Sequence, residues 1–214
     1  MDLRSRLADI DARISDAARS AGRDAASITR IVVTKFHPVG LVQDLAALGV
    51  ADVGENRQQE LTAKRGEYDG PSLRWHFIGQ AQTNKARAVR RDADAVHSLD
   101  RMKLADALHG ARAEDDPTDV LDVLIQVNLT DDQGRGGVAP DGVAELAEHV
   151  VASCPSLRLR GVMGVAPLDG APAAAFARLV DHSQRIRAVV PDADWISAGM
   201  TGDFAEAIAA GATH

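Results

Sequence analysis

The stretch Ile31–Asn56, IVVTKFHPVGLVQDLAALGVADVGEN, reads as a strand, a helix and a second strand. The β-branched run 31–34 predicts a short buried strand. Leucines at helical spacing, with proline at the start and glycine at the end, predict a helix over 38–48. The run 50–53 predicts the next strand. This order predicts two parallel strands joined by a crossover helix.

The same alternation continues to the end of the chain. Further strands are expected at 73–78, 95–97, 120–128, 157–163 and 195–197. Helices are expected at 2–21, 57–67, 82–91, 101–113, 141–153, 172–189 and 202–210. Seven strand–helix units exceed the five or six strands of most doubly wound sheets and approach the eight of a TIM barrel. We therefore expect an α/β fold, a (β/α)8 TIM barrel with an extra N-terminal helix.

Residues 211–214 stand where an eighth strand would begin. We expect a single domain over residues 1–214. Either its eighth strand is missing from the sequence, so that its C-terminal end is incomplete, or the barrel is open there. A chain of 214 residues suits one domain.

Composition excludes several classes of protein. The net charge of −7 disfavours nonspecific binding to nucleic acid or anionic membranes, and 3% aromatic residues disfavour base-stacking platforms. The sequence lacks an apolar run long enough to span a membrane, and its first 20 residues lack the apolar core of a signal peptide. Cys154 stands alone, which favours a reducing, cytoplasmic compartment. No zinc-like spacing of Cys and His is present, and we expect no metal.

Polar residues follow several of the predicted strands, at the barrel end where such folds carry their chemistry. Lys35 directly follows the first strand, and desolvation there would favour a neutral amine that attacks carbonyls. The alternative is a lysine that extends its ammonium into solvent. His76 is either a pocket residue or a satisfied core histidine. Asn56 suits a helix cap, and Glu55 either neutralises a cation or favours a helix start.

The segment Ser197-Ala198-Gly199-Met200-Thr201-Gly202 links the last predicted strand to a helix. Small residues and a helix N-terminus suit a phosphate group, whereas Asp203 would repel one if it pointed inward. An ordinary Thr-capped helix is the alternative. The segment matches neither a Walker motif nor a Gly-x-Gly-x-x-Gly fingerprint.

These residues give the chain a family likeness. It resembles the pyridoxal-phosphate homeostasis proteins, the YggS/PROSC family. The matching segments are VVTK (32–35), VGENR (53–57), WHFIG (75–79), HSLD (97–100), IQVN (125–128), GVM (161–163) and SAGMTGD (197–203).

The resemblance implies a single-domain barrel similar to the N-terminal domain of alanine racemase, with pyridoxal 5′-phosphate held as a Schiff base. It implies that Lys35 is the lysine of that Schiff base. It further implies that Ser197, Gly199, Met200 and Thr201 form part of the phosphate site, and that Asn56 and His76 line the cofactor pocket. Family members usually continue with an Arg-Ile-Gly-Thr-like segment, which this sequence does not contain.

Two functions follow from this resemblance. The first is a cytoplasmic, monomeric carrier in vitamin B6 homeostasis, without turnover, whose partners are pyridoxal phosphate and the apoenzymes that depend on it. The second is a fold-type III amino-acid racemase, which needs a tyrosine as its second base. Tyr68, the one tyrosine, lies in the polar stretch 64–70, which favours the carrier. A third reading is a barrel that binds another phosphorylated metabolite, with Lys35 paired to the phosphate.

Overall fold

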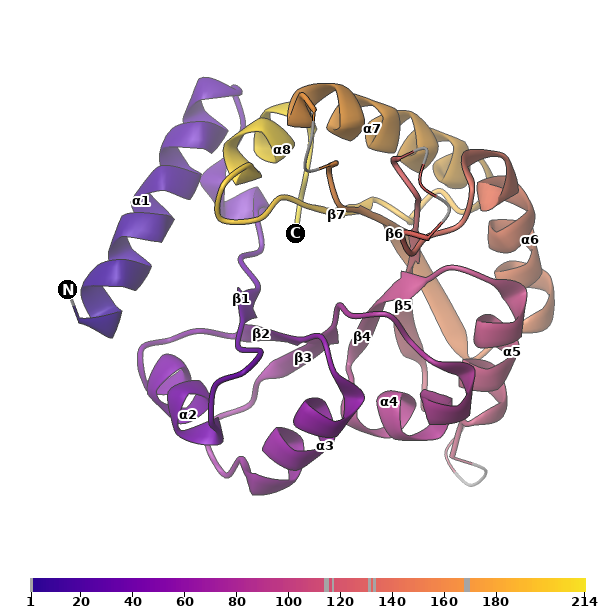
Figure 1. Cartoon of the computed structure of the whole chain (residues 1–214), viewed down its shortest axis with the longest axis horizontal. Coiled ribbons are helices and arrows are strands. Elements are labelled where there is room, and N and C mark those ends of the chain that lie inside the picture. The colour runs from indigo at the N-terminus through magenta and orange to yellow at the C-terminus, as the bar shows by residue number, and fades with distance from the viewer. Residues whose placement is uncertain (1, 114–115, 117, 131, 133, 168–169) are drawn as a thin grey trace.

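The computed structural model describes residues 2–113, 116, 118–130, 132, 134–167 and 170–214. Within these residues a single parallel sheet has the strand order β1-β2-β3-β4-β5-β6-β7. The strands are β1 (Val32–Val33), β2 (Asp52–Glu55), β3 (Arg74–Phe77), β4 (Ala95–Leu99), β5 (Leu121–Gln126), β6 (Leu157–Gly164) and β7 (Trp195–Ala198). Each strand therefore pairs with the next along the chain, as in a barrel, and Figure 1 shows the sheet curling on itself.

Helices surround this curled sheet (Figure 1). They are α1 (Leu3–Ser20), α2 (Val39–Ala47), α3 (Gln58–Glu67), α4 (Ala86–Asp92), α5 (Met102–Gly110), α6 (Val143–Ser153), α7 (Pro172–Val189) and α8 (Phe204–Ala210). The extra helix α1 packs against α8, where the Arg13 guanidinium lies 4.8 Å from the Phe204 ring centroid. No helix within the described ranges has the length and apolar character needed to cross a membrane.

The last residues of the chain lie between the two ends of the sheet. The Thr213 N–H donates to Ile196 O of β7 at 2.9 Å, and Ala198 N–H donates to His214 O at 3.0 Å. On the other side, Thr29 N–H donates to Thr213 O at 2.7 Å, shortly before β1 begins. Residues 212–214 therefore occupy the position predicted for the start of an eighth strand, and they bring β1 and β7 close together.

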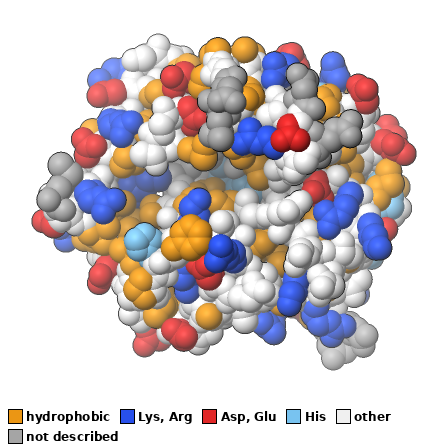
Figure 2. Space-filling model, in the orientation of Figure 1, with side chains coloured by type: hydrophobic (Ala, Val, Ile, Leu, Met, Phe, Trp, Pro, Cys, Tyr) orange, Lys and Arg blue, Asp and Glu red, His pale blue; other side chains and the backbone are white. Residues whose placement is uncertain are grey.

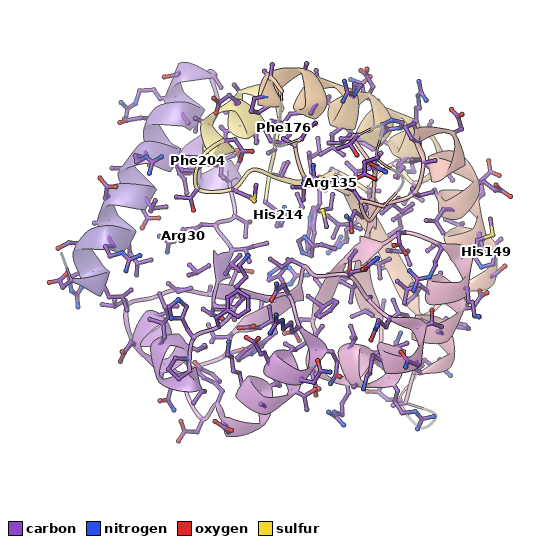
Figure 3. All side chains as sticks on the ribbon, in the orientation of Figure 1. Arg30, Arg135, His149, Phe176, Phe204 and His214 are labelled. Carbon is purple, nitrogen blue, oxygen red and sulfur yellow. The ribbon has the colours of Figure 1, made fainter. Side chains whose placement is uncertain are left out.

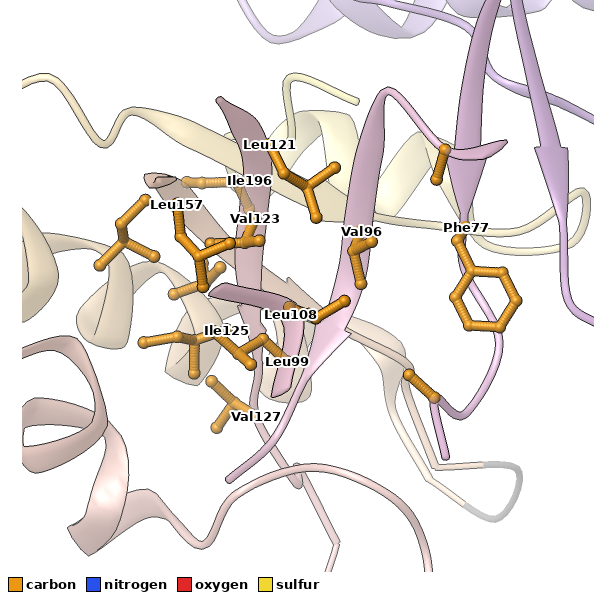
Figure 4. Packing of buried hydrophobic residues seen from close by; sticks show 14 of the residues in the cluster. Phe77, Val96, Leu99, Leu108, Leu121, Val123, Ile125, Val127, Leu157 and Ile196 are labelled. Atoms are coloured by element: carbon orange, nitrogen blue, oxygen red, sulfur yellow. The ribbon is translucent and has the colours of Figure 1, made fainter. Parts of the chain in front are cut away.

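The apolar core lies mainly between the sheet and its helices. Alternate residues of β5, such as Leu121, Val123 and Ile125, pack with Leu108 of α5 and with Ile196 of β7 in a continuous cluster (Figure 4). Each such side chain contributes about 1.5–3 kcal/mol when it is fully buried. This layer explains why the strands read as apolar runs in the sequence.

Several predicted boundaries differ from the structure. The second strand is 52–55 rather than 50–53, because Gly54 and Glu55 continue the ladder with β3. The fourth strand runs to Leu99 rather than ending at residue 97. The last helix begins at Phe204 rather than residue 202, because a turn precedes it.

Candidate functional site

Lys35 lies at the carboxyl end of β1, as predicted, but it is exposed rather than desolvated. β1 comprises only Val32 and Val33, pairs with β2 alone, and leaves Val33 41% exposed. The predicted buried strand is therefore wrong for this edge of the sheet. The Lys35 side chain makes no hydrogen bond or ion pair with any residue that the structure describes, so its amine is available for a ligand.

The turn after Lys35 has an unusual backbone. Phe36 has a φ of +66°, a left-handed conformation that costs a bulky residue energy. Its N–H donates to Glu60 Oε2 at 2.8 Å, and the Arg57 guanidinium lies 4.9 Å from its ring centroid. Two residues at the start of α3 thus stabilise the turn that presents Lys35.

A second lysine beside this turn is buried and was not identified from the sequence. Lys64 Nζ donates to Glu55 Oε1 at 2.6 Å and to the backbone oxygen of Thr34 at 2.8 Å, and it lies 3.6 Å from Glu60 Oε2. Its side chain is 7% exposed and that of Glu55 is fully buried. Glu55 therefore neutralises a cation, one of its two predicted roles. Lys64 is fully engaged, whereas the neighbouring Lys35 has no partner among the described residues.

Asn56 does not cap the following helix, contrary to the predicted capping pattern. α3 begins at Gln58 with Arg57 as its N-cap, and no side chain accepts a bond there. Instead, Asn56 Oδ1 is buried and accepts no hydrogen bond from any described residue. Gly79 packs directly on this residue, since a Cβ at Gly79 would lie 1.9 Å from Asn56 O. An unpaired buried acceptor next to Lys35's strand fits a ligand that offers an N–H or O–H group.

Four polar side chains form a hydrogen-bonded chain through the barrel interior. Asp52 Oδ1 lies 2.9 Å from His76 Nε2, and His76 Nδ1 lies 2.8 Å from His97 Nε2. His97 Nδ1 lies 2.8 Å from Ser197 Oγ. These residues come from β2, β3, β4 and β7. Both ring nitrogens of His76 have protein partners, which favours its reading as a satisfied core histidine.

Burial also determines the charge of His97, a member of this hydrogen-bonded chain, and of His214, which lies close to it. Burial, aided by His76, His214 and Arg74, holds the pKa of His97 well below its usual value. Burial lowers the pKa of His214 to about 4, with further contributions from His76 and Arg74. His214 lies inside the ring of strands (Figure 3) and stacks on Trp195 with 4.1 Å between ring centroids. Both imidazoles are therefore neutral near pH 7.

In the predicted phosphate segment, Ser197 and Ala198 form the end of β7, with Ser197 buried, and residues 199–202 lie in an exposed loop before α8. Gly199 has a φ of +95°, and a Cβ there would lie 2.7 Å from Phe204 Cα, so this position requires glycine. Met200 is 52% exposed, and Thr201 is exposed. The carboxylate of Asp203 accepts the Met200 N–H, so one amide of the loop is already engaged. The alternative of a Thr-capped helix is wrong, because Asp203 is the N-cap of α8.

A pocket of about 180 Å³ lies at the carboxyl ends of β5 and β6, the same end of the barrel as Lys35. Its lining includes Gln126, Asn128, Arg135 and Val165. Figure 2 shows Lys and Arg side chains gathered with hydrophobic ones around the centre of the molecule in this view. Basic and apolar groups together suit an anionic ring compound.

A separate cluster lies on the outer rim, where Figure 3 places His149. Asp106 Oδ1 lies 2.6 Å from His149 Nε2 and 3.7 Å from Cys154 Sγ. Burial, followed by the charge and hydrogen bond of Asp106, raises the pKa of the Cys154 thiol to about 11. The thiol is therefore protonated, and the cluster joins α5 to the end of α6.

Comparisons with known proteins agree with this architecture. A family model, alanine racemase, N-terminal domain, matches residues 6–214. The pyridoxal phosphate homeostasis protein of Pseudomonas aeruginosa is 38% identical over 213 residues, which cover 97% of this chain and 89% of that protein. That of Mycobacterium tuberculosis is 37% identical over 229 residues, covering 99% and 88%.

Solved structures show the same relationship. PipY of Synechococcus elongatus with pyridoxal phosphate bound has a TM-score of 0.78 and 33% identity, covering 93% of this chain and 94% of that one. Alanine racemase of Corynebacterium glutamicum has a TM-score of 0.65 at 15% identity and shares the fold, covering 91% of this chain and 54% of that one. The chain belongs to the family of pyridoxal phosphate homeostasis proteins, built on the N-terminal domain of alanine racemase.

Proposed function

We propose that this chain binds pyridoxal 5′-phosphate at the carboxyl end of its barrel and holds it as a Schiff base on Lys35. The observation that carries the proposal is the contrast between two neighbouring lysines. Lys64 is buried and paired with Glu55, whereas the Lys35 amine is exposed and has no partner among the described residues. Pyridoxal phosphate, when bound, supplies an aldehyde that condenses with an amine.

The chemistry requires one free amine and the loss of one water. Lys35 is the residue that would supply this amine as the free base, and water would be the by-product of its condensation with the aldehyde. Asn56 Oδ1 is an acceptor for the ligand. Residues 212–214 separate β1 from β7. The residues that suit the phosphate lie at and just after the end of β7: Ser197, Gly199, Met200 and Thr201.

We infer a role in vitamin B6 homeostasis without turnover. A racemase of this fold type needs a tyrosine as its second base. Tyr68 lies at the end of α3, where its hydroxyl donates to Pro71 O at 2.7 Å and its ring packs against Trp75. This engagement supports a carrier. Racemisation of alanine or serine that depends on Lys35 would contradict it.

The site-directed test is reduction with borohydride. Wild-type protein mixed with pyridoxal phosphate should show a yellow absorption band that reduction abolishes, with the added mass on the peptide that contains Lys35. Lys35→Ala should abolish the adduct, and Lys103→Ala, a change at an exposed lysine of α5, should leave it unchanged. Lys35→Arg separates the remaining alternative, since binding that survives this change indicates an ion pair with phosphate and no Schiff base.

We also propose that the protein is a cytoplasmic monomer that delivers pyridoxal phosphate to apoenzymes. Sedimentation at micromolar concentration should give a mass near 22.6 kDa. Loaded protein should restore activity to a pyridoxal-phosphate-dependent apoenzyme faster than the Lys35→Ala variant mixed with the same cofactor. Equal rates would remove the delivery role and leave binding intact.

A further inference from the structure

The chain Asp52–His76–His97–Ser197 has one hydrogen bond at each of its three contacts, and each bond holds one proton. The distances are 2.9, 2.8 and 2.8 Å. The two imidazole rings meet edge to face, at 70°. The direction of each bond therefore depends on the bond before it.

With Asp52 as a carboxylate and both imidazoles neutral, only one arrangement satisfies all three contacts. The carboxylate accepts, so His76 carries its proton on Nε2. His76 Nδ1 is then an acceptor, and His97 must donate from Nε2. His97 Nδ1 is an acceptor in turn, and the Ser197 hydroxyl must donate to it. The hydroxyl proton of Ser197 thus points into the protein, away from any ligand.

A phosphate dianion only accepts hydrogen bonds, so this arrangement prevents Ser197 from donating to it. Rotating the hydroxyl alone would leave His97 Nδ1 and Ser197 Oγ as two facing acceptors 2.8 Å apart. Reversing all three bonds avoids this conflict. The reversed chain contains one more proton, held between Asp52 and His76, and it frees the Ser197 hydroxyl to donate outward.

We propose that Asp52, His76 and His97 form a proton relay that positions the Ser197 hydroxyl, and that binding of a phosphate monoester at Ser197 adds one proton to the relay at its Asp52–His76 end. The inference rests on the proposed phosphate site. Asp52, His76 and His97 are positioning residues, because they act through Ser197.

The groups around the relay decide where the added proton lies. Arg74, His214 and Arg160 oppose a positive charge nearby, and the Asp52 carboxylate favours one. Burial holds the pKa of His97 well below its usual value, so this ring does not become the cation. Once the other two bonds reverse, His76 Nε2 and Asp52 Oδ1, 2.9 Å apart, would be two facing acceptors, so the added proton lies between them.

The test uses pyridoxine 5′-phosphate, which lacks the aldehyde and so forms no Schiff base. At pH 8 its phosphate is a dianion, since the second ionisation lies near pH 6. Calorimetry in two buffers of different ionisation enthalpy should give uptake of about one proton per ligand, and affinity should fall about tenfold per pH unit above pH 8. Ser197→Ala should bind more weakly with no uptake.

Asp52→Asn is the sharpest variant, because it lies two imidazoles away from the ligand. The Asn amide can donate to His76 Nε2, so the reversed chain needs no added proton. This variant should bind with no uptake and with little dependence on pH. Asp192→Asn, a change at an exposed aspartate, should behave as wild type.

Nitrogen-15 NMR of the histidines gives an independent reading in the wild-type protein. His97 should carry its proton on Nε2 when free and on Nδ1 in the complex. Binding with no proton uptake, uptake that persists in Asp52→Asn, or an unchanged His97 tautomer would each overturn the relay. If neither pyridoxine 5′-phosphate nor pyridoxal phosphate binds, the proposed function fails instead.

Discussion

Removal of the Lys64 ammonium should destabilise the protein strongly, although this lysine forms no part of the ligand chemistry. Lys64 comes from α3 and joins Thr34 at the end of β1 to Glu55 at the end of β2. The substitution Lys64→Met retains much of the apolar length of the side chain but leaves the fully buried Glu55 carboxylate without its cation.

The magnitude follows from that burial. Breaking a buried ion pair by removing one partner costs about 3–5 kcal/mol, because the remaining charge is buried and uncompensated. For a chain of this size each kcal/mol lowers Tm by about 2–4 °C, so Lys64→Met should lower Tm by roughly 6–20 °C. The turn at Lys35 and Phe36 should also loosen, and the adduct with pyridoxal phosphate should form more slowly.

Urea unfolding of a double-mutant cycle measures the pair itself. Glu55→Gln should be destabilising alone, whereas Lys64→Met combined with Glu55→Gln should cost less than the sum, with a coupling energy of about 1–3 kcal/mol. Lys103→Met, at an exposed position of α5, should change the unfolding free energy by less than about 0.5 kcal/mol. A loss below about 1 kcal/mol for Lys64→Met, or additive single changes, would refute the buried ion pair.

Two further predictions concern pH and backbone space. The pKa of His214 is about 4 in the folded protein and 6.5 in the unfolded chain, so the unfolded chain binds more protons. The free energy of unfolding therefore falls as pH drops below about 6.5, by up to about 1.4 kcal/mol per pH unit. His97 acts in the same direction. Urea unfolding at pH 7.5 and 5.5 should show a loss that His214→Asn reduces, and equal stability at both pH values would contradict this. Gly161→Ala should cost more than about 4 kcal/mol, because its Cβ would lie 1.9 Å from Trp195 O at a φ of +150°. Gly40→Ala in α2 is the control, because its Cβ meets no atom within 4 Å, and it should stabilise the protein by about 0.5–1 kcal/mol. Similar unfolding free energies for the two variants would show that Gly161 does not approach Trp195 closely.

The order and type of the elements were predictable, because the core lies between the sheet and the helices and selects apolar strands. The run 120–128 contains β5, whose residues 121–125 are buried. The prediction failed where a strand lacks this cover. β1 has one partner strand, and its apolar residues are partly exposed, so an apolar run there did not indicate burial.

The candidate site was predictable only where chemistry follows chain order. Lys35 and the loop after Ser197 could be placed at strand ends from the sequence alone. Lys64 could not, because its position in a polar helix gives no sign of the carboxylate that buries it. The contact between His97 and Ser197 joins residues 100 positions apart, so only the closed sheet reveals it. The sequence offered one signal for Lys64. It follows Glu60 by four residues, a spacing that places the two side chains next to each other on a helix.

The outer face of the sheet contributes mainly to stability, and the inner face holds the polar side chains of the proposed site. In β3, Trp75 and Phe77 are buried in the apolar cluster, while Arg74 and His76 alternate with them and contact polar side chains of other strands. Arg74 pairs with Asp122 of β5, which Arg158 and Arg160 of β6 also contact. The contact between Arg74 and Asp122, like that between His97 and Ser197, joins strands that are not neighbours in the ladder and forms only across the interior of a curled sheet. Because the outer layer contributes most of the apolar burial, the interior can hold a titratable relay at little cost to the fold. Variants of the relay should therefore change the proton linkage of ligand binding more than they change the stability of the barrel.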